Sequence, residues 1–421
     1  MIRTYDIVII GGGSAGIAAA ISAYNNGIKD ILLLEKDAEL GGILLQCIHN
    51  GFGLHRFKEE LAGPAYAEKW VDMLGETSVE VKTSTTVTDI TSDRQITYVN
   101  PKEGYVTIKA KAIIMSVGCR ERSRGAIAIP GYRPAGVWSA GTAQKYLNMQ
   151  GYMVGKRVFI LGSGDIGLIM ARRMTLEGAK VLGVAELMPY SNGLPRNMKQ
   201  CLDDFDIPLY LSHTVTDIRG KDRLEGITIT KVDDRLQPID GTGIDFEVDT
   251  LLLSVGLIPD NTLLENAGAI LHPKTKGPVV DEHLMTSIPG IFACGNSLHV
   301  HDLVDFVSME GEEAGIAAAK FALDSDSDKK GQSPRLELKP LDGIGYVLPT
   351  YIDAARMEPS LEIKMRVTRN DRGVKLVIKN DDKVIKEVKK VRIAPSEMEK
   401  IVLKREDLEG ITGQLTVGVE K

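Results

Sequence analysis

The stretch from Tyr5 to Glu35, YDIVIIGGGSAGIAAAISAYNNGIKDILLLE, constrains the fold of this chain more than any other. The apolar run at Asp6–Ile10 predicts a buried strand, and the glycine-rich turn after it is expected to open a helix. A second apolar run, Ile31–Leu34, predicts another strand, and Glu35 follows it, 19 residues after Gly16. Strand, glycine turn, helix and strand in this order predict a βαβ unit and hence a parallel sheet.

The glycine turn predicts a binding site for the pyrophosphate of a dinucleotide, because it reads G-x-G-x-x-G between a strand and a helix. Gly11 allows the tight turn, Gly13 lets the backbone come close to the pyrophosphate, and Gly16 lets helix and strand pack together. The N–H groups at a helix N-terminus lack partners within the helix and carry a partial positive charge, which favours phosphate. Glu35 is placed to accept hydrogen bonds from a ribose diol.

The same arrangement occurs a second time. Arg157–Leu161 predicts a strand, a second glycine turn with the sequence GSGDIG spans residues 162–167, and Leu168–Glu177 predicts a helix. The next strand, Lys180–Ala185, closes on Glu186, again 19 residues after the last glycine of the turn. A carboxylate here repels a 2′-phosphate, and the following Leu-Met-Pro brings no arginine. The second site is therefore expected to bind NAD(H) rather than NADP(H).

Bulk properties exclude several classes of protein. The chain has 421 residues, too many for one core, so two or three domains are expected. A net charge of −6 argues against a general nucleic-acid binder, and no apolar run reaches the roughly 18 residues of a transmembrane segment. The four cysteines lie far apart without a C-x-x-C pair, which argues against a zinc ribbon or a disulfide framework. With no visible signal peptide, a cytoplasmic protein is expected.

The rest of the sequence predicts an α/β fold in which one dinucleotide-binding domain is inserted into another. The strands and helices expected outside the two glycine units are Ala65–Leu74 (helix), Val79–Ile90, Tyr105–Ile108, Ala112–Gly118, Ala140–Met149 (helix), Tyr210–Ile218, Leu224–Val232, Asp249–Val255 and Asp302–Phe321 (helix). A polar linker at 324–335 precedes a tail that alternates in period two, which predicts a small antiparallel β unit. The expected domains are 1–119 with 257–325, the insertion 120–256, and the β-rich 338–421.

With these motifs in place, residues 1–325 resemble the two-dinucleotide-binding-domain flavoproteins, the pyridine-nucleotide oxidoreductases related to low-molecular-weight thioredoxin reductase. The resemblance rests on the paired glycine turns, on Ser116-Val117-Gly118, on TLLLSVGLIP at Thr250–Pro259 and on GIFACGN at Gly290–Asn296. It implies that the first unit holds FAD and the inserted unit holds NAD(P)H. Asn296 replaces the usual Asp of the family, and the redox C-x-x-C of thioredoxin reductases is absent, which excludes a disulfide reductase of that kind.

Two further stretches narrow the resemblance. Pro130–Tyr132 and Ala135–Gln144 look like the nucleotide-binding subunits of opine oxidase, hydrogen cyanide synthase and heteromeric sarcosine oxidase. Gly41–Gly53 and the β-rich tail resemble the branch that accompanies anaerobic glycerol-3-phosphate dehydrogenases. The resemblance implies hydride transfer between NAD(H) and FAD and exchange of electrons with a partner dehydrogenase flavoprotein subunit, in a homo- or hetero-oligomer.

The residues expected to contact the two cofactors lie in the glycine turns, at the strand ends beside them and in the motifs of the resemblance. They are Gly11, Gly13, Ser14, Ala15, Gly16, Glu35, Lys36, Gly42, Gln46, Val87, Ser116, Val117, Gly118, Gly162, Gly164, Asp165, Ile166, Gly167, Glu186, Gly256, Gly295 and Asn296.

Three residues are candidates for the chemistry itself: Cys47, His49 and Asp302. In one interpretation Cys47 lies beside the flavin as a thiolate or charge-transfer donor and His49 relays protons; in the other, Cys47 is a small packed residue and His49 makes a hydrogen bond in a turn. The helix beginning near Asp302 is expected to point its N-terminus at the N1/O2 edge of the flavin.

Two alternative functions stay open at this point. A single-cysteine NADH oxidase or peroxidase would cycle a sulfenic acid at Cys47, and a non-catalytic subunit would hold its flavin only as part of a scaffold. No metal site is predicted, because the spacing of His299, His301 and Asp302 matches no standard ligand set.

Overall fold

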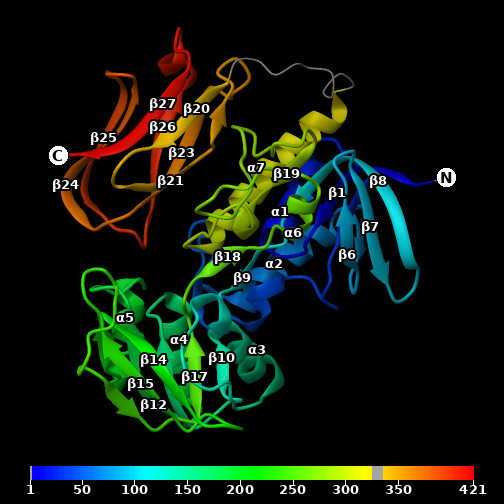
Figure 1. The fold of residues 1–421 in the computed structure, drawn as a ribbon. Helices are drawn as coiled ribbons and strands as arrows, with labels where there is room; N and C mark the ends of the chain where they lie inside the picture. The colour runs from blue at the N-terminus through cyan, green and yellow to red at the C-terminus, as the bar shows by residue number, and fades with distance from the viewer. Residues whose placement is uncertain (1, 325–334) are drawn as a thin grey trace. The chain divides into compact units, whose positions relative to one another are not determined.

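The computed structural model describes residues 2–324 and 335–421, which form two compact units (Figure 1). One unit is Arg120–Ile258, and the other joins Met1–Cys119 to Pro259–Lys421. The chain crosses between them at β9 (Cys119–Glu121) and β18 (Leu257–Pro259). The linker expected at 324–335 lies, apart from its two end residues, outside the described residues. None of the helices in the described ranges has the length and apolarity to cross a membrane.

The first unit is built on a seven-stranded sheet in the order β5-β2-β1-β8-β7-β6, with β19 also paired to β8. Its strands are β1 (Thr4–Ile10), β2 (Ile31–Leu34), β5 (Glu80–Lys82), β6 (Thr86–Ile90), β7 (Gln95–Asn100), β8 (Gly104–Met115) and β19 (Ile291–Ala293). The neighbours β5, β2, β1 and β8 run parallel, as the βαβ pattern predicts. A two-stranded sheet of β3 (Asn50–Phe52) and β4 (Leu61–Ala62) lies apart from them.

β8 is one strand where the sequence pattern predicts two. The structure has twelve residues in a single strand, Gly104–Met115, instead of separate strands at Tyr105–Ile108 and Ala112–Gly118. The first half of β8 pairs antiparallel with β7, and its last residues pair parallel with β19. The polar residues between the two apolar runs, among them the exposed Lys111, interrupt the hydrophobic pattern but not the backbone pairing.

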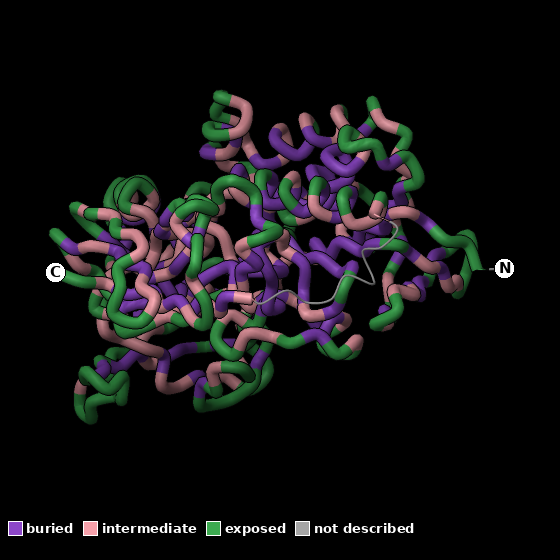
Figure 2. Tube along the Cα trace, turned by 90° about the horizontal axis from the view of Figure 1, so that it is seen from above, coloured by how far each residue is buried: buried purple, intermediate pink, exposed green. Residues whose placement is uncertain are grey.

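Three helices cover one face of the parallel strands, and residues of β6 and β7 share a core with the other face. The helices of the unit are α1 (Ser14–Asn25), α2 (Gly63–Gly75), α6 (Thr262–Asn266) and α7 (Val304–Leu323). Ile7 and Ile9 of β1 share a core with α1, α2 and α7, while the alternate residue Val8 packs with Ile96 and Tyr98 of β7. In Figure 1, α7 lies alongside α1. Figure 2 shows buried residues in the interior and exposed residues on the outer turns. Because both faces are covered, the central strands are apolar throughout.

The second unit contains a parallel five-stranded sheet in the order β10-β17-β11-β12-β13 and an antiparallel sheet β14-β15-β16. Its elements are β10 (Val137–Ser139), α3 (Ala140–Gln150), β11 (Arg157–Leu161), α4 (Asp165–Leu176), β12 (Lys180–Glu186), α5 (Pro195–Cys201), β13 (Leu209–Leu211), β14 (His213–Arg219), β15 (Gly226–Lys231), β16 (Ile244–Phe246) and β17 (Thr250–Leu253). The strand expected at Tyr210–Ile218 is divided between the two sheets. Ser212, with a φ of +55°, ends β13 and redirects the chain into β14.

Residues 336–420 form two β-sheets around one hydrophobic core. The strands are β20 (Leu336–Pro340), β21 (Ile344–Leu348), β22 (Tyr351–Ile352), β23 (Ser360–Val367), β24 (Asp371–Asn380), β25 (Lys383–Ile393), β26 (Met398–Lys404) and β27 (Gln414–Glu420). The sheets have the orders β22-β20-β27-β24-β25 and β21-β23-β26. Leu376 and Leu415 of the first sheet share a core with Ile363 and Leu403 of the second, so we call this region the C-terminal β-sandwich.

The period-two pattern predicts a purely antiparallel unit. The sandwich departs from this prediction, because β20 and β27 pair in parallel. The predicted fold class is confirmed: an α/β chain with two Rossmann-like sheets and a β-rich C-terminal region.

Candidate functional site

The first glycine turn, between β1 and α1, has no room for a side chain at two positions. Gly11 has a φ of +107°, and a Cβ there would lie 2.5 Å from the carbonyl oxygen of Ser116. A Cβ on Gly16 would overlap the carbonyl oxygen of Gly11. The Ser116 hydroxyl donates to that same oxygen at 3.0 Å. The glycines therefore let the turn, α1 and the end of β8 pack backbone against backbone.

Gly13 faces open space, in contrast to its neighbours. No heavy atom lies within 4 Å of a Cβ built on it, apart from those of its adjoining residues. Gly13 is the N-cap of α1, where no side chain caps the helix and no acidic residue occupies the first turn. The first N–H groups of α1 are thus available to an anion. An open cradle beside a bare helix N-terminus fits the pyrophosphate of FAD.

Glu35 is fixed at the tip of β2 by two backbone N–H groups. One carboxylate oxygen accepts from Gly12 at 2.6 Å, and the other accepts from Asp37 at 2.8 Å. The residue is only 5% exposed. Since a carboxylate offers about four lone-pair positions, acceptor capacity remains for the hydroxyls of a ribose. The geometry fits the sequence-based prediction that Glu35 binds the ribose diol.

Residues from distant parts of the sequence meet at this turn. A Cβ on Gly295, in the late GIFACGN motif, would lie 2.9 Å from the Cβ of Ala15, which follows Ser14 in the first turn of α1. A Cβ on Gly42 would lie 3.2 Å from the Cα of Gly13. The structure therefore assembles the expected early and late motifs around one turn.

The other residues expected at the FAD site differ in burial. Lys36 is exposed, Gln46 is buried in the 3₁₀ helix η1 (Gly42–Gln46), and Val87 is half-buried in β6. β6 begins next to Thr85, whose N–H donates to the carbonyl oxygen of Glu35 at 2.8 Å. Val117 and Gly118 directly follow β8, as the chain approaches β9. Cofactor contacts for these five residues stay a prediction.

Cys47 follows η1 and is protonated in this environment. Its Sγ donates to the carbonyl oxygen of Ile43 at 3.3 Å, and burial raises the pKa of the thiol to about 12. His49 Nδ1 lies 3.1 Å from the carbonyl oxygen of Asn50, and its ring centroid is 4.9 Å from that of Phe52. These contacts favour the packed thiol and the turn histidine over the thiolate and the proton relay. Catalytic roles for the two residues stay a prediction.

Asp302 lies before the helix that the sequence predicts it to begin. α7 starts at Val304, and Asp302 instead pairs with the C-terminal β-sandwich. Its Oδ1 is 2.7 Å from Arg366 Nη1, and its Oδ2 accepts from the backbone N–H of Met398 at 2.8 Å. The predicted start of the helix is therefore wrong by two residues, because the Asp302 carboxylate binds the sandwich rather than the first turn of α7. A catalytic role for Asp302 stays a prediction.

The acid in the first turn of α7 is Asp305, which sequence reasoning missed. It is buried and accepts three backbone N–H groups, from Gly53 at 3.1 Å, His55 at 3.1 Å and Arg56 at 2.7 Å. Asp305 therefore anchors the segment that continues from Cys47 onto the N-terminus of α7. The signal in the sequence is weak, since one Asp near a helix start is common.

The second glycine turn repeats the first one closely. Glu186, at the end of β12, accepts from the Ser163 N–H at 2.9 Å and from the Ser163 hydroxyl at 2.7 Å. Its other oxygen accepts from the Met188 N–H at 3.0 Å. A Cβ on Gly162 would overlap the carbonyl oxygen of Ser254, and Gly164 is the N-cap of α4. Turn, helix start and terminal carboxylate again have the arrangement that fits a dinucleotide.

For the other residues expected to bind NAD the structure shows contacts within the fold, and their contacts with the cofactor stay a prediction. Asp165 Oδ1 accepts from the Leu194 N–H at 2.9 Å and from Asn197 Nδ2 at 2.7 Å, so its side chain holds the segment after β12. Gly167 packs against Gly162 as Gly16 packs against Gly11 in the first unit. Ile166 belongs to the core around α4, and Gly256 follows β17 with a φ of +104°.

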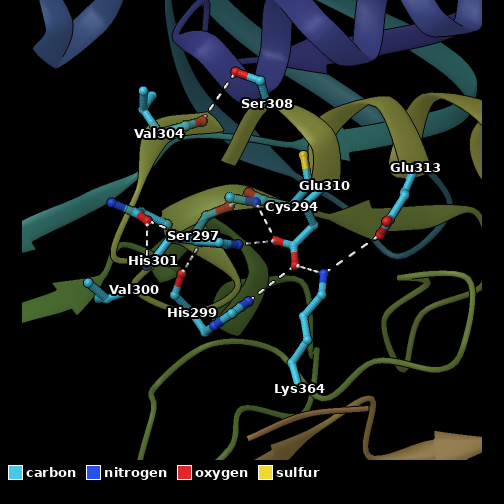
Figure 3. Close-up of polar contacts among 12 residues, drawn as sticks. Cys294, Ser297, His299, Val300, His301, Val304, Ser308, Glu310, Glu313 and Lys364 are labelled. Carbon is cyan, nitrogen blue, oxygen red and sulfur yellow. Dashed lines mark hydrogen bonds and ion pairs between the residues drawn. The ribbon is translucent and has the colours of Figure 1, made fainter. Parts of the chain in front are cut away.

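A buried charged cluster lies beside Gly295, and the sequence analysis did not find its central residue, Glu310. Glu310 is 1% exposed in α7 and accepts from the Gly295 N–H at 2.8 Å (Figure 3). Its other oxygen lies 2.9 Å from Lys364 Nζ and 3.1 Å from His299 Nε2. Although burial alone would raise it, the pKa of Glu310 lies well below its usual range, because the Lys364 ammonium and the histidines are close. Burial lowers the pKa of His299 to about 4.

Two observations bear on a metal at this cluster. His299, His301 and Glu310 offer ligand atoms that all lie within 4.8 Å of one another. The Lys364 ammonium already contacts the carboxylate, and a metal ion there would meet a buried positive charge.

The sequence does carry a signal for Glu310, since this residue takes a position on the otherwise small and apolar face of α7 that includes Val307 and Ala314.

Comparison with known proteins agrees with the two dinucleotide sites. Residues 5–320 match the family described as pyridine nucleotide-disulphide oxidoreductase. The chain is 23% identical over 336 residues to hydrogen cyanide synthase subunit HcnB of Pseudomonas protegens, covering 75% of this chain and 68% of that protein. It is 26% identical over 350 residues to a ferredoxin–NADP reductase of Leuconostoc mesenteroides, covering 79% of this chain and 96% of that protein.

A solved structure, the thioredoxin reductase of T. acidophilum, superposes on 76% of this chain and 100% of its own with a TM-score of 0.62 and 25% identity. The family match covers well over half of the chain and includes both glycine turns. The chain therefore belongs to the pyridine nucleotide-disulphide oxidoreductase family and is a flavoenzyme that uses FAD and NAD(P)H.

Proposed function

We propose that this flavoenzyme transfers hydride between NAD(H) and FAD and exchanges the electrons with a separate dehydrogenase subunit, which oxidises glycerol 3-phosphate. FAD supplies the redox chemistry when bound, and the protein positions its ring and sets the surrounding charge. The choice of NAD(H) rests on Glu186, whose fixed carboxylate would repel a 2′-phosphate.

The observation that carries the proposal is the state of Cys47. A peroxidase-like enzyme needs a reactive thiolate at this residue, whereas desolvation raises the pKa of the half-buried Cys47 thiol to about 12, and the thiol donates to a backbone carbonyl. The sequence contains no C-x-x-C, so a redox pair of the kind found in thioredoxin reductases does not carry the electrons away from FAD. Transfer to another protein accounts for both facts.

Two resemblances support a dehydrogenase subunit as that partner. HcnB is itself described as a subunit of hydrogen cyanide synthase. The segment Gly41–Gly53 and the C-terminal β-sandwich correspond to the stretches that resemble the branch accompanying anaerobic glycerol-3-phosphate dehydrogenases. We infer a hetero-oligomer in which the partner carries the substrate site.

Replacing Cys47 by Ser tests the proposal against the peroxidase alternative. We expect the Cys47→Ser variant to keep NADH-dependent reduction of an artificial dye within about twofold of the unmodified protein, because a protonated, packed thiol takes no electrons. Cys201→Ser is the control, since Cys201 is a free cysteine whose pKa burial also raises, to about 11. Loss of all NADH-dependent turnover in Cys47→Ser alone would favour the sulfenic acid mechanism.

The partner is tested with an anaerobic glycerol-3-phosphate dehydrogenase flavoprotein as the probe. With glycerol 3-phosphate and NAD⁺ present, NADH should form only when both proteins are mixed. NADH formation by either protein alone, or none by the mixture while dye reduction is intact, would contradict the proposed partner.

A further inference from the structure

One lysine of the C-terminal β-sandwich reaches a buried carboxylate of the FAD-binding fold. Lys364 lies on β23, and its side chain is 14% exposed. Its Nζ is 2.9 Å from Glu310 Oε1 and 3.7 Å from Glu313 Oε2, both on α7 (Figure 3). Glu310 is 1% exposed, and the Lys364 ammonium is the charged group closest to its carboxylate. The ring nitrogens of His299 and His301 also lie beside this carboxylate, at 3.1 Å and 3.4 Å.

The same carboxylate holds the backbone of a FAD motif. Glu310 Oε2 accepts from the N–H of Gly295. A Cβ on Gly295 would lie 2.9 Å from the Cβ of Ala15, in the first turn of α1. The next residue is Asn296, whose Oδ1 accepts from the backbone N–H of His301 at 3.0 Å. An unbroken series of polar contacts therefore runs from Lys364 through Glu310 to the turn expected to contact FAD.

Other residues of the C-terminal β-sandwich hold the segment that follows this turn. The Tyr346 hydroxyl lies 3.3 Å from His299 Nδ1, and Arg366 Nη2 donates to the carbonyl oxygen of Val300 at 3.1 Å. Arg366 also pairs with Asp302. The sandwich thus contacts this segment at His299, Val300 and Asp302, and Lys364 links it directly to the acceptor of the Gly295 N–H.

Removing the lysine has a definite physical consequence. A buried carboxylate without its cation is strongly unfavourable, so it takes up a proton or moves toward water. Protonation weakens the hydrogen bond that Gly295 donates, because a charged acceptor binds an N–H more strongly than a neutral one. Movement toward water takes the acceptor away from the Gly295 N–H. The turn that carries Asn296 would then lose its fixed position.

We propose that Lys364 is a positioning residue of the FAD site, which acts through Glu310 to fix the Gly295–Asn296 turn. The C-terminal β-sandwich is by this contact part of the FAD-binding machinery. The inference goes beyond the proposed exchange of electrons with a partner, and the FAD affinity that tests it is measurable without any partner protein.

The test is the Kd for FAD of the flavin-free full-length protein, measured by quenching of flavin fluorescence. Lys364→Met should raise this Kd about tenfold, the effect of losing one hydrogen bond to a charged group. Lys364→Arg, which keeps the charge, should stay within about threefold of the unmodified protein. The control is Lys390→Met, because Lys390 pairs with the 7% exposed Glu399 at 2.7 Å, wholly inside the C-terminal β-sandwich; its FAD affinity should not change.

A double variant keeps the test decisive if Lys364→Met folds poorly. Lys364→Met with Glu310→Gln removes both charges, and a neutral pair of similar size is tolerated in a buried site. If Lys364 acts through Glu310, the double variant should bind FAD no more weakly than the weaker single variant. The proposal is overturned if the FAD affinity of the folded Lys364→Met variant stays within twofold of the unmodified protein. It is equally overturned by additive effects in the double variant, or by zinc bound in stoichiometric amount in the purified protein.

Discussion

Glu35 and Glu186 are held in the same way in the two units. Each accepts an N–H from the second residue of its glycine turn and another from the residue two positions after the carboxylate. The second turn adds the Ser163 hydroxyl, which uses one more lone pair of Glu186. The carboxylates are thus already oriented, so a ribose bound as predicted would cost little side-chain entropy.

Glu186→Gln should weaken NADH binding and reduce the preference for NADH over NADPH. The substitution keeps the size of the side chain but removes the charge that repels a 2′-phosphate. Because hydrogen bonds to charged groups are worth roughly 1.5–3 kcal/mol, we expect the Kd for NADH to rise about tenfold. Calorimetric titration with both nucleotides measures the effect. Glu177→Gln is the control, since Glu177 pairs with Arg173 on the surface of the same unit at 2.6 Å; an unchanged NADH/NADPH ratio in Glu186→Gln would contradict the role of the charge.

His299 should make the protein less stable as the pH falls below neutral. Burial lowers the pKa of this ring to about 4 in the folded protein, with His301 adding to the shift and Glu310 opposing it, whereas the unfolded chain has the ordinary value near 6.5. Between these values only the unfolded state binds the proton, so stability is lost as the pH falls through this window. From pH 7 to pH 5 the loss is about 2 kcal/mol.

Urea unfolding at the two pH values measures this loss. His299→Gln removes the titrating ring, so the pH-dependent loss in that variant should be smaller by about the same 2 kcal/mol. The comparison cancels groups common to both proteins, such as Asp281 and Glu282, whose pKa values burial raises. Equal losses in the two proteins would show that His299 is not kept neutral.

At the residue scale, the sequence predicts those residues whose place in the fold follows from a local motif. The two terminal glutamates follow from motif spacing, because strand, turn and helix fix how far along the chain the second strand ends. Glu310, Asp305 and Lys364 do not, because their roles depend on contacts between segments 15 to more than 250 residues apart. Cys47 stands out in the sequence as a candidate for the chemistry, but its protonation depends on desolvation, which no spacing shows.

At the scale of elements, the strand–turn–helix at residues 4–25 is the most predictable part of the fold. The strand ends where the glycines begin, and the helix begins as soon as they end. Elements whose pairing partners change along their length were the least predictable, as in β8, which joins β7, β1 and β19. Hydrophobic periodicity reports which face is buried but not which strand lies beside it.

Gly13→Ala separates the binding role of the first glycine turn from its folding role. The Gly13 backbone is in an extended conformation that alanine adopts easily, and the space around its Cβ is open. The free energy of unfolding of the variant should therefore lie within about 1 kcal/mol of that of the unmodified protein. Its Kd for FAD should rise at least tenfold, because the methyl group occupies space that the pyrophosphate needs.

Gly75→Ala, at the end of α2, is the matched control, since a Cβ there also meets nothing within 4 Å. It should bind FAD as the unmodified protein does. Flavin fluorescence quenching measures the Kd for FAD, and thermal unfolding measures the stability of each variant. Unchanged FAD affinity in Gly13→Ala would show that the pyrophosphate does not lie against this turn.

At the scale of the whole molecule, the chain repeats one dinucleotide-binding device in two compact units and adds a β-sandwich. The repeat and the α/β class were visible in the sequence because each glycine turn is a local signal. The part played by the C-terminal β-sandwich was not visible. Its alternating strands predict a β-rich region, but the contacts of Lys364 and Arg366 with the FAD-binding fold arise only from tertiary packing.

Rapid anaerobic mixing of the FAD-loaded protein with NADH tests whether the two dinucleotide sites of this chain exchange hydride. We expect the yellow absorbance of the flavin to bleach in a single turnover with NADH, and NADPH to bleach it at least tenfold more slowly because of Glu186. A flavin band that stays unbleached by either nucleotide would contradict the account and favour a scaffold role for the bound FAD.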